Sequence, residues 1–287
     1  MKKILIQIDG DPQPSVFDRV VAVDAGADEI FSHGAVTPAQ VQNIVHGAIF
    51  TRGPADLKNT AIFVGGSDVA LGEQLMAEAQ KHMLPKFGLR VSILLDANGA
   101  NTTAAAAVLA ARKHLDLKNT RAIVLGGTGP VGQRVARLLA KEGAAVRVGS
   151  RQATRAAAVC QKIESMVPGA RLEPVGTSNA ADLPAILKDQ TLVVAAGAAG
   201  VVLLPKDART GSKTLKVAID LNAVPPLGIE GVDATDKAKE RDGVIAYGAL
   251  GVGGTKMKIH KAAIAKLFES NDQVMDAEEV YALGLTL

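Results

Sequence analysis

The stretch TRAIVLGGTGPVGQRVARLLAKEGAAVRVGSR, residues 120–151, decides the fold. A short apolar run, Ala122–Leu125, leads directly into glycines spaced as Gly127-x-Gly129-x-x-Gly132, and a helical pattern and a second apolar run follow. This order of strand, glycine turn, helix and strand is the context that a dinucleotide-binding fingerprint requires. It predicts a Rossmann-type unit that holds a pyrophosphate at the helix N-terminus. A plain strand-to-helix turn is the alternative.

Each glycine of this turn has its own expected role. Gly127 allows the tight turn, Gly129 lets the backbone approach the pyrophosphate, and Gly132 lets the helix pack closely on the strand. Pro130 suits the first helical position, where its missing N–H costs nothing. The contacts expected from this turn to the cofactor come from Gly127, Thr128, Gly129, Pro130 and Val131.

The end of the second strand indicates which dinucleotide binds. NAD sites usually carry Asp or Glu about 20 residues beyond the glycines, to hold the ribose hydroxyls. Here Ser150 and Arg151 stand in that place. A guanidinium can clasp the 2′-phosphate of NADP, which a carboxylate would repel. The sequence therefore favours NADP, with NAD as a weaker substitute, and a solvated loop arginine is the alternative.

Two later strands also end in small or polar residues. VVAAGAAG, residues 193–200, would admit a flat ring close to its backbone, so Ala196 and Gly197 are expected to contact the cofactor. DLNAVPPLGI, residues 220–229, offers Asn222 as a partner for a ribose or carboxamide. Structural turns explain both segments equally well.

Composition narrows the classes of function. Aromatic residues make up only 3% of the 287 residues, Trp is absent and the net charge is +3, so neither a base-stacking surface nor a basic nucleic-acid patch is expected. No apolar run approaches the length of a membrane span. The single cysteine, Cys160, suits a reducing cytoplasm, and the five scattered histidines do not form a metal-binding motif.

Strand and helix patterns alternate along the chain, which predicts parallel sheets flanked by helices. A fresh strand after residue 119 indicates a second unit, and the closing helices are expected to return to the first. We therefore expect an α/β protein of two domains: a Rossmann-type doubly wound parallel sheet over residues 116–249, and a second α/β substrate domain over residues 1–115 and 250–287, with a cleft between them. The segment 247–256, YGALGVGGTK, is expected to precede the closing helices.

Substrate contacts are expected where strands of the first half end. LLDANGANTTAAAA, residues 94–107, follows a buried strand and carries Asp96, Asn98, Asn101 and Thr102. DPQPSVFD, residues 11–18, adds Phe17 and Asp18 as ring and polar contacts. An Asn-Gly turn and a helix cap account for part of this polarity, and the surplus predicts a ligand with several heteroatoms.

Lys256 and Lys258 are predicted near the start of a helix, where the helix dipole disfavours cations. Such a placement indicates an external reason, for example an anionic or carbonyl-bearing ligand. A solvated helix face is the alternative.

Eight segments together resemble a known family over essentially the whole chain. They are PSVFD, IFTRG, AIFVGG, DANGANTTAAA, GGTGPVG, DLNAVPPLGI, GVDATDK and KIHKAAIAKLFES. The chain resembles the NADP-dependent methylene-tetrahydromethanopterin/methylene-tetrahydrofolate dehydrogenases of methylotrophic bacteria. The resemblance implies a reduced pterin as substrate, bound in the cleft, and a homo-oligomer, either a trimer or a hexamer. The pterin contacts it implies are Phe17, Asp18, Asp96, Asn98, Asn101 and Lys256.

The resemblance also implies the reaction, which is oxidation of the one-carbon bridge between N5 and N10 of the reduced pterin. Oxidation of this methylene bridge removes a hydride and leaves a resonance-stabilised methenyl cation, so no general base is required. A carboxylate could stabilise that cation, which makes Asp18 and Asp96 catalytic candidates beside Lys256. Related folate enzymes that also hydrolyse the product carry a Tyr-x-x-x-Lys pair. Neither Tyr247 nor Tyr281 has a lysine four residues on, so cyclohydrolase activity is not expected.

Two other functions fit part of the sequence. An NADP-linked dehydrogenase of a shikimate-like hydroxy acid would share the two-domain layout, but it would need a lysine–aspartate pair that handles a proton. A non-catalytic NADP-sensing module would bind the cofactor without turnover. The polar loop at residues 94–103 weighs against the sensing module.

Overall fold

The computed structural model describes residues 1–287 and divides the chain into two compact units. The first unit comprises Met1–Thr102 and Met257–Leu287, and the second comprises Thr103–Lys256. The sequence predicted the boundaries at 115/116 and 249/250, whereas the structure places them at 102/103 and 256/257. The reason is that helices α4 (Ala100–Arg112) and α9 (Ala249–Lys266) run unbroken through the two junctions. A continuous helix presents none of the linker composition by which a boundary is recognised in a sequence.

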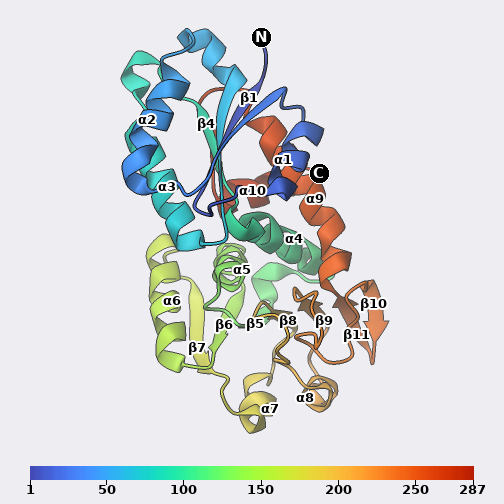
Figure 1. Ribbon diagram of the computed structural model, residues 1–287. Coiled ribbons are helices and arrows are strands. Elements are labelled where there is room, and N and C mark those ends of the chain that lie inside the picture. Colours follow the sequence, from blue (N-terminus) through green and yellow to red (C-terminus); the bar gives the residue numbers. More distant parts are fainter. The chain divides into compact units, whose positions relative to one another are not determined.

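The first unit is a five-stranded, entirely parallel sheet in the order β12-β4-β3-β1-β2. Helices α2 and α3 lie on one side of this sheet, and α1 and the end of α9 lie on the other (Figure 1). Since both faces are covered, the central strands are mostly apolar and their few polar residues, such as Gln7 and Asp9 of β1, are buried. The strands are β1 (Ile4–Asp9), β2 (Glu29–His33), β3 (Thr60–Gly65), β4 (Ser92–Leu95) and β12 (Val274–Met275). The helices are α1 (Val16–Asp24), α2 (Pro38–Ile49), α3 (Val69–Lys81) and α10 (Ala277–Gly284).

The second unit is a seven-stranded sheet in the order β10-β11-β9-β8-β5-β6-β7, parallel except for the β10–β11 pair. The strands are β5 (Arg121–Leu125), β6 (Ala145–Ser150), β7 (Arg171–Gly176), β8 (Leu192–Ala195), β9 (Val217–Asp220), β10 (Lys237–Arg241) and β11 (Val244–Tyr247). The helices are α5 (Pro130–Lys141), α6 (Ala153–Met166), α7 (Leu183–Ile186) and α8 (Lys206–Gly211). The prediction of a mixed α/β fold with parallel sheets is confirmed.

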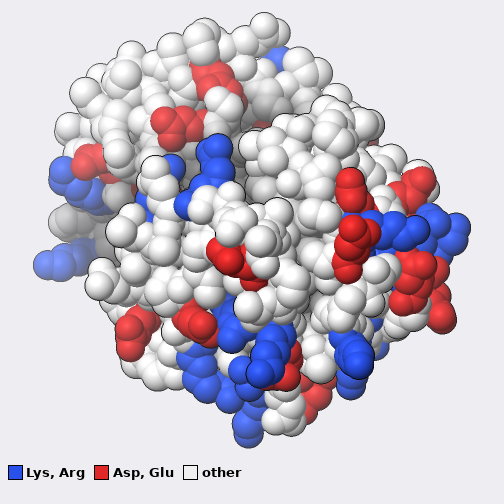
Figure 2. Space-filling view, turned by 90° about the horizontal axis from the view of Figure 1, so that it is seen from below, with Lys and Arg blue, Asp and Glu red and all other residues white.

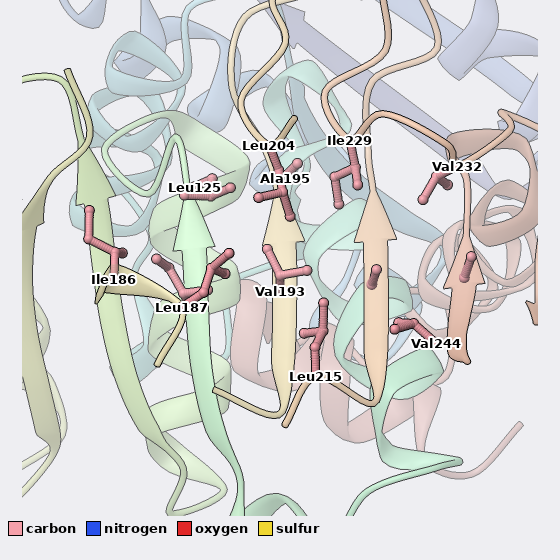
Figure 3. Close-up of a cluster of buried hydrophobic side chains, with 13 residues drawn as sticks. Leu125, Ile186, Leu187, Val193, Ala195, Leu204, Leu215, Ile229, Val232 and Val244 are labelled. Carbon is pink, nitrogen blue, oxygen red and sulfur yellow. The ribbon is translucent and has the colours of Figure 1, made fainter. Parts of the chain in front are cut away.

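Five short 3₁₀ turns complete the secondary structure: Pro54–Asn59, Pro85–Phe87, Ala97–Gly99, Leu117–Asn119 and Ala180–Asp182. The second unit has a continuous apolar core on one face of its sheet (Figure 3). Side chains from β5, β8, β9 and β11 point to this face and meet residues of α7 and of the loops, among them Leu187, Leu204 and Ile229. In addition, helices α5 and α6 pack against strands β5, β6 and β7. The core thereby fixes the carboxyl ends of these strands, where the glycine turn lies.

The hairpin of β10 and β11 was not predicted. The β10 sequence, KAKER, is charged and mostly exposed, so it carries no alternating apolar pattern. The hairpin is anchored instead by Arg209, whose fully buried guanidinium donates to the backbone carbonyls of Glu230 and Arg241 and pairs with Asp242. Contacts between segments distant in the chain thus hold this edge of the sheet.

Most of the glycine-rich segment 247–256 forms the first turns of α9, which begins at Ala249. An added Cβ at Gly248 or Gly251 would collide with the backbone carbonyls of Asp233 and Asp236, so these glycines allow close packing. Lys256 is consequently the eighth residue of an 18-residue helix. The prediction that it lies near the helix start was wrong, and the dipole no longer explains its placement.

None of the helices combines the length and the apolar composition that a membrane span requires. On the face shown in Figure 2, Lys and Arg side chains are most frequent toward the lower edge, with Asp and Glu side chains among them. The two signs of charge are interspersed there, in keeping with the small net charge of +3.

Candidate active site

The glycine turn joins β5 to α5, and its geometry explains three of its glycines. The left-handed residue is Gly126, at φ +71°. Gly127 was expected to provide the tight turn, but its position instead excludes a side chain, because an added Cβ would lie 2.8 Å from Cγ1 of Val148. An added Cβ at Gly132 would meet the carbonyl oxygen of Gly126, so the helix packs closely on the turn as predicted.

Gly129 is the N-cap of α5, and Pro130 is its first residue, so the free N–H groups of the first turn are available to an anion. An added Cβ at Gly129 would meet only carbonyl oxygens at 3.4 and 3.5 Å, which are ordinary contacts. Gly129 also lines a cavity, so its backbone is accessible to a ligand. This arrangement fits a dinucleotide pyrophosphate.

The turn lines a cavity of about 770 Å³ within the second unit. Seven of the ten expected cofactor residues line it: Thr128, Gly129, Pro130, Ser150, Arg151, Ala196 and Gly197. Gly127, Val131 and Asn222 do not. The cavity thus joins the glycine turn to the ends of β6 and β8, as the parallel order of these strands requires.

Three polar residues of this cavity were not identified from the sequence: Gln152, Arg155 and Thr177. Arg155 lies in the first turn of α6, one helical turn beyond Arg151, and both arginines are exposed at the rim. A cation in the first turn of a helix opposes the helix dipole, and that signal in SRQATR could have revealed Arg155. Two guanidinium groups and two hydroxyls, those of Ser150 and Thr177, together suit a phosphate monoester.

Asn222 has a structural role in its own loop. Its Oδ1 accepts a hydrogen bond from the Val224 backbone N–H at 3.0 Å, and its Nδ2 donates to the Pro226 carbonyl at 3.3 Å. Asp220 is fully buried and accepts from the backbone N–H groups of Asn222 and Ile229. Burial raises the pKa of the Asp220 carboxyl, against the lowering effect of these hydrogen bonds. The segment therefore forms a closed loop that offers no side-chain amide to the cofactor cavity.

In the first unit, the loop after β4 uses most of its polarity internally. Asp96, at 1% exposure, accepts from the backbone N–H groups of Asn101 and Thr102, both at 3.0 Å, and from the Thr102 hydroxyl at 2.7 Å. Asn101 is equally buried and donates to the Leu95 carbonyl and to Asp276. We assign Asp96, Asn101 and Thr102 the role of holding the start of α4, in place of the expected substrate or catalytic contacts.

Asn98 differs from these residues because its side chain is exposed. It adopts the left-handed conformation, at φ +53°, and its backbone N–H donates to the Gly66 carbonyl at 2.7 Å. That hydrogen bond joins the loops that follow β3 and β4. Asn98 is therefore the residue of the four expected here whose side chain remains accessible to a ligand.

Phe17 and Asp18 lie in the first turn of α1, which Ser15 caps by accepting from the Asp18 backbone N–H at 3.2 Å. Phe17 is 52% exposed, so its ring is accessible to a ligand. The Asp18 side chain, at 15% exposure, is stabilised by the helix dipole. A flat apolar ring thus lies next to a carboxylate at the carboxyl edge of the sheet.

His260, on α9, was not identified from the sequence. Its imidazole is fully buried, lies 5.8 Å from the Phe63 ring centroid and 6.1 Å from that of Phe17, and places Nε2 3.9 Å from Oδ1 of Asp18. The spacing of Lys256 and His260 in KMKIH puts both on one face of the helix, which is the signal that could have revealed it. No group of three His, Cys, Asp or Glu side chains is arranged to hold a metal ion.

Comparison with known proteins shows which family the chain belongs to. Residues 16–98, which run from α1 to the loop after β4, match the family model described as methylene-tetrahydromethanopterin dehydrogenase, N-terminal. The bifunctional protein MdtA of Methylorubrum extorquens is 47% identical over 285 residues, covering 99% of this chain and 98% of that protein. The chain belongs to the methylene-tetrahydromethanopterin dehydrogenase family. The resemblance seen in the sequence is thereby confirmed.

A second member of the family from the same organism is the NAD(P)-dependent methylenetetrahydromethanopterin dehydrogenase, which is 31% identical over 283 residues. It is covered over 94% of its length, and this chain over 95%. Family membership makes this chain an oxidoreductase. The match extends through both units, so the glycine turn and the loops of the first unit are parts of one enzyme.

Two solved structures share the fold of this chain. Shikimate 5-dehydrogenase from Listeria monocytogenes aligns with a TM-score of 0.56 at 14% identity, over 98% of this chain and 96% of that one. Quinate dehydrogenase from Corynebacterium glutamicum aligns with a TM-score of 0.51 at 16% identity, over 100% and 99%. At such low identity these matches establish the Rossmann-type α/β architecture alone.

Proposed function

We propose that this protein oxidises the N5,N10-methylene bridge of a reduced pterin to the methenyl form, with NADP as the oxidant, in one-carbon metabolism. The pterin is tetrahydromethanopterin, tetrahydrofolate or both. The observation that carries the proposal is the family match over residues 16–98, because this segment contains Phe17, Asp18 and Asn98. Together with Lys256, these are the residues among the expected pterin contacts whose side chains are not buried.

The second unit, in this proposal, is the NADP-binding domain. When bound, NADP supplies a hydride acceptor, C4 of the nicotinamide ring. The turn at Thr128–Pro130 holds the pyrophosphate at the N-terminus of α5, and Ala196 and Gly197 leave room for a flat ring. Arg151 and Arg155 hold the 2′-phosphate, so NADP is bound more tightly than NAD.

The first unit, in this proposal, is the pterin-binding domain. The Phe17 ring packs against the pterin, and Asn98 supplies an amide for its heteroatoms. Loss of hydride leaves a cation on the one-carbon bridge, and no proton has to be removed. The Asp18 carboxylate stabilises this cation as it develops. Lys256, the last residue of the second unit, is the other catalytic candidate, and it donates to a carbonyl or anionic group of the substrate.

We propose no cyclohydrolase activity, because neither tyrosine forms the Tyr-x-x-x-Lys pair and both are buried. The Tyr247 hydroxyl is hydrogen-bonded to His114 at 2.8 Å, and burial raises the pKa of Tyr247.

We also propose a homo-oligomer, a trimer or a hexamer, and a cytoplasmic location that suits the buried Cys160. Light scattering on the purified protein measures the number of subunits.

An absorbance assay tests the reaction. The protein is mixed with methylene-tetrahydromethanopterin or methylene-tetrahydrofolate, each with NADP and with NAD. We expect NADPH and the methenyl product to form in equal amounts, with slower turnover on NAD. NADPH formation from shikimate or quinate instead would identify a hydroxy-acid dehydrogenase, and NADP binding without any turnover would identify a sensing module. Methenyl hydrolysis well above the spontaneous rate would refute the absence of cyclohydrolase activity.

Lys256→Met should lower kcat/KM for the methylene-pterin about thirtyfold, because a hydrogen bond from a charged group contributes roughly 1.5–3 kcal/mol. The KM for NADP should stay within about twofold, since the substitution leaves the cofactor cavity unchanged. The matched control is Lys258→Met, which removes an exposed ammonium from the same helix and should leave both constants unaltered. Equal losses in the two variants would show that only general charge on α9 matters.

A further inference from the structure

We infer that His260 is a positioning residue for the pterin half of the site, acting through Asp18 and Phe17. The inference rests on the proposed function and extends it to a buried side chain outside the expected contacts. His260 itself is fully buried and reaches no solvent. Its influence on a ligand must therefore pass through the side chains that surround it.

The imidazole lies close to two aromatic rings, those of Phe63 and Phe17. Phe63, on the central strand β3, is stacked with it at 5.8 Å and an interplanar angle of 21°. Phe17, on α1, lies on the ligand-accessible side at 6.1 Å and 34°. Phe63 is itself 1% exposed, so it forms a rigid base for the stack. The position of His260 thereby sets how far the half-exposed Phe17 ring can sink toward the core.

The same imidazole lies next to the proposed catalytic carboxylate. Nε2 of His260 is 3.9 Å from Oδ1 of Asp18, which is beyond hydrogen-bonding distance and within the range of an ion pair. Hydrogen bonds of a catalytic group are often long in the absence of ligand and shorten in the complex. We propose that Nε2 donates to Asp18 when the pterin binds, and that this bond fixes the carboxylate toward the developing cation.

Ordinary core packing would also bury a histidine beside two phenylalanines, so the test has to separate packing from positioning. The variant His260→Phe keeps a flat ring but removes both nitrogens, and His260→Gln restores a donor without the ring. The matched control is His46→Phe, because His46 also contacts aromatic rings, Phe50 at 5.3 Å and His82 at 6.1 Å, but lies on α2.

In steady-state assays with methylene-tetrahydrofolate and NADP, His260→Phe should lower kcat/KM for the pterin about thirtyfold while the KM for NADP stays constant. His260→Gln should recover a part of that loss in kcat, and His46→Phe should resemble the unmodified protein. In the Asp18→Asn background, His260→Phe should have much less effect than in the parent, because both substitutions remove the same interaction. Full additivity of the two losses, or no loss in His260→Phe, would overturn the inference.

Imidazole ¹⁵N NMR gives a second measurement that does not depend on turnover. Tetrahydrofolate added to the full-length protein should shift the ring nitrogens of His260, assigned by their absence in His260→Phe, and should leave those of His46 in place. An unmoved His260 signal at saturating tetrahydrofolate would overturn the inference even if the enzyme is active. Absence of turnover together with a shifted His260 signal would instead count against the proposed reaction alone.

Discussion

Replacing Arg151 and Arg155 together with alanine should lower kcat/KM for NADP about a thousandfold. Both side chains lie at the rim of the cavity that the glycine turn lines, beside the hydroxyls of Ser150 and Thr177. A charge-assisted hydrogen bond contributes roughly 1.5–3 kcal/mol, and two guanidinium groups on one phosphate make several such bonds, so a loss of about 4 kcal/mol is expected. Since NAD lacks the 2′-phosphate, its kcat/KM should change by less than about threefold.

The result to measure is the ratio of kcat/KM for NADP to that for NAD, with the pterin held at saturation. The single variants separate the two arginines and should each account for part of the loss. Arg121→Ala provides the control, because Arg121 is an exposed arginine at the start of β5 that does not line the cavity. A parallel loss for NADP and NAD would mean that the arginines hold the pyrophosphate or the fold, and the assignment of the 2′-phosphate would be wrong.

Asp18→Asn should lower kcat for the methylene-pterin about three-hundredfold with little change in the KM for NADP. The substitution preserves the shape of the side chain and removes its charge. Loss of a preorganised group that stabilises developing charge typically costs about 10²–10³ in kcat. The effect should fall on kcat more than on the KM for the pterin, because the cation forms only as the hydride leaves.

Asp24→Asn is the matched control for this variant. Asp24 ends the same helix, α1, and also pairs with α9, through an exposed ion pair to Lys261 at 2.6 Å. An exposed ion pair contributes little, so activity should be unchanged. If Asp18→Asn retained nearly full kcat, the cation would have to be stabilised by another group, and the role of Asp18 would be limited to the local structure of α1.

The sequence was sufficient for the parts of the fold that depend on local spacing. The run Ala122–Leu125, the glycines after it and Pro130 predicted a strand, a turn and a helix start, and each lies where it was expected. These features depend on short-range sterics, which neighbouring residues decide. The hairpin of β10 and β11 depends on Arg209, which lies 32 and 33 residues before its partners Arg241 and Asp242. No local sequence pattern predicted this hairpin.

The candidate site divides in the same way. Polar residues at the ends of β1, β4 and β6, and small residues at the end of β8, were identified correctly as lying at strand ends, because parallel strands end at a common edge. Which of them face a ligand could not be predicted. Asp96, Asn101 and Thr102 looked like substrate contacts in the sequence, yet they satisfy one another and the start of α4.

By itself the sequence determined the alternating α/β pattern, the glycine turn, the basic residue at the end of β6 and the family. Each of these features depends only on residue types at fixed spacing along the chain. Only the tertiary structure decided that Asn101 is tied to Asp276, 175 residues away, that Arg155 joins Arg151 at one cavity, and that His260 packs against Asp18. The physical reason is that a buried polar group must find a partner, and that partner can come from any part of the chain.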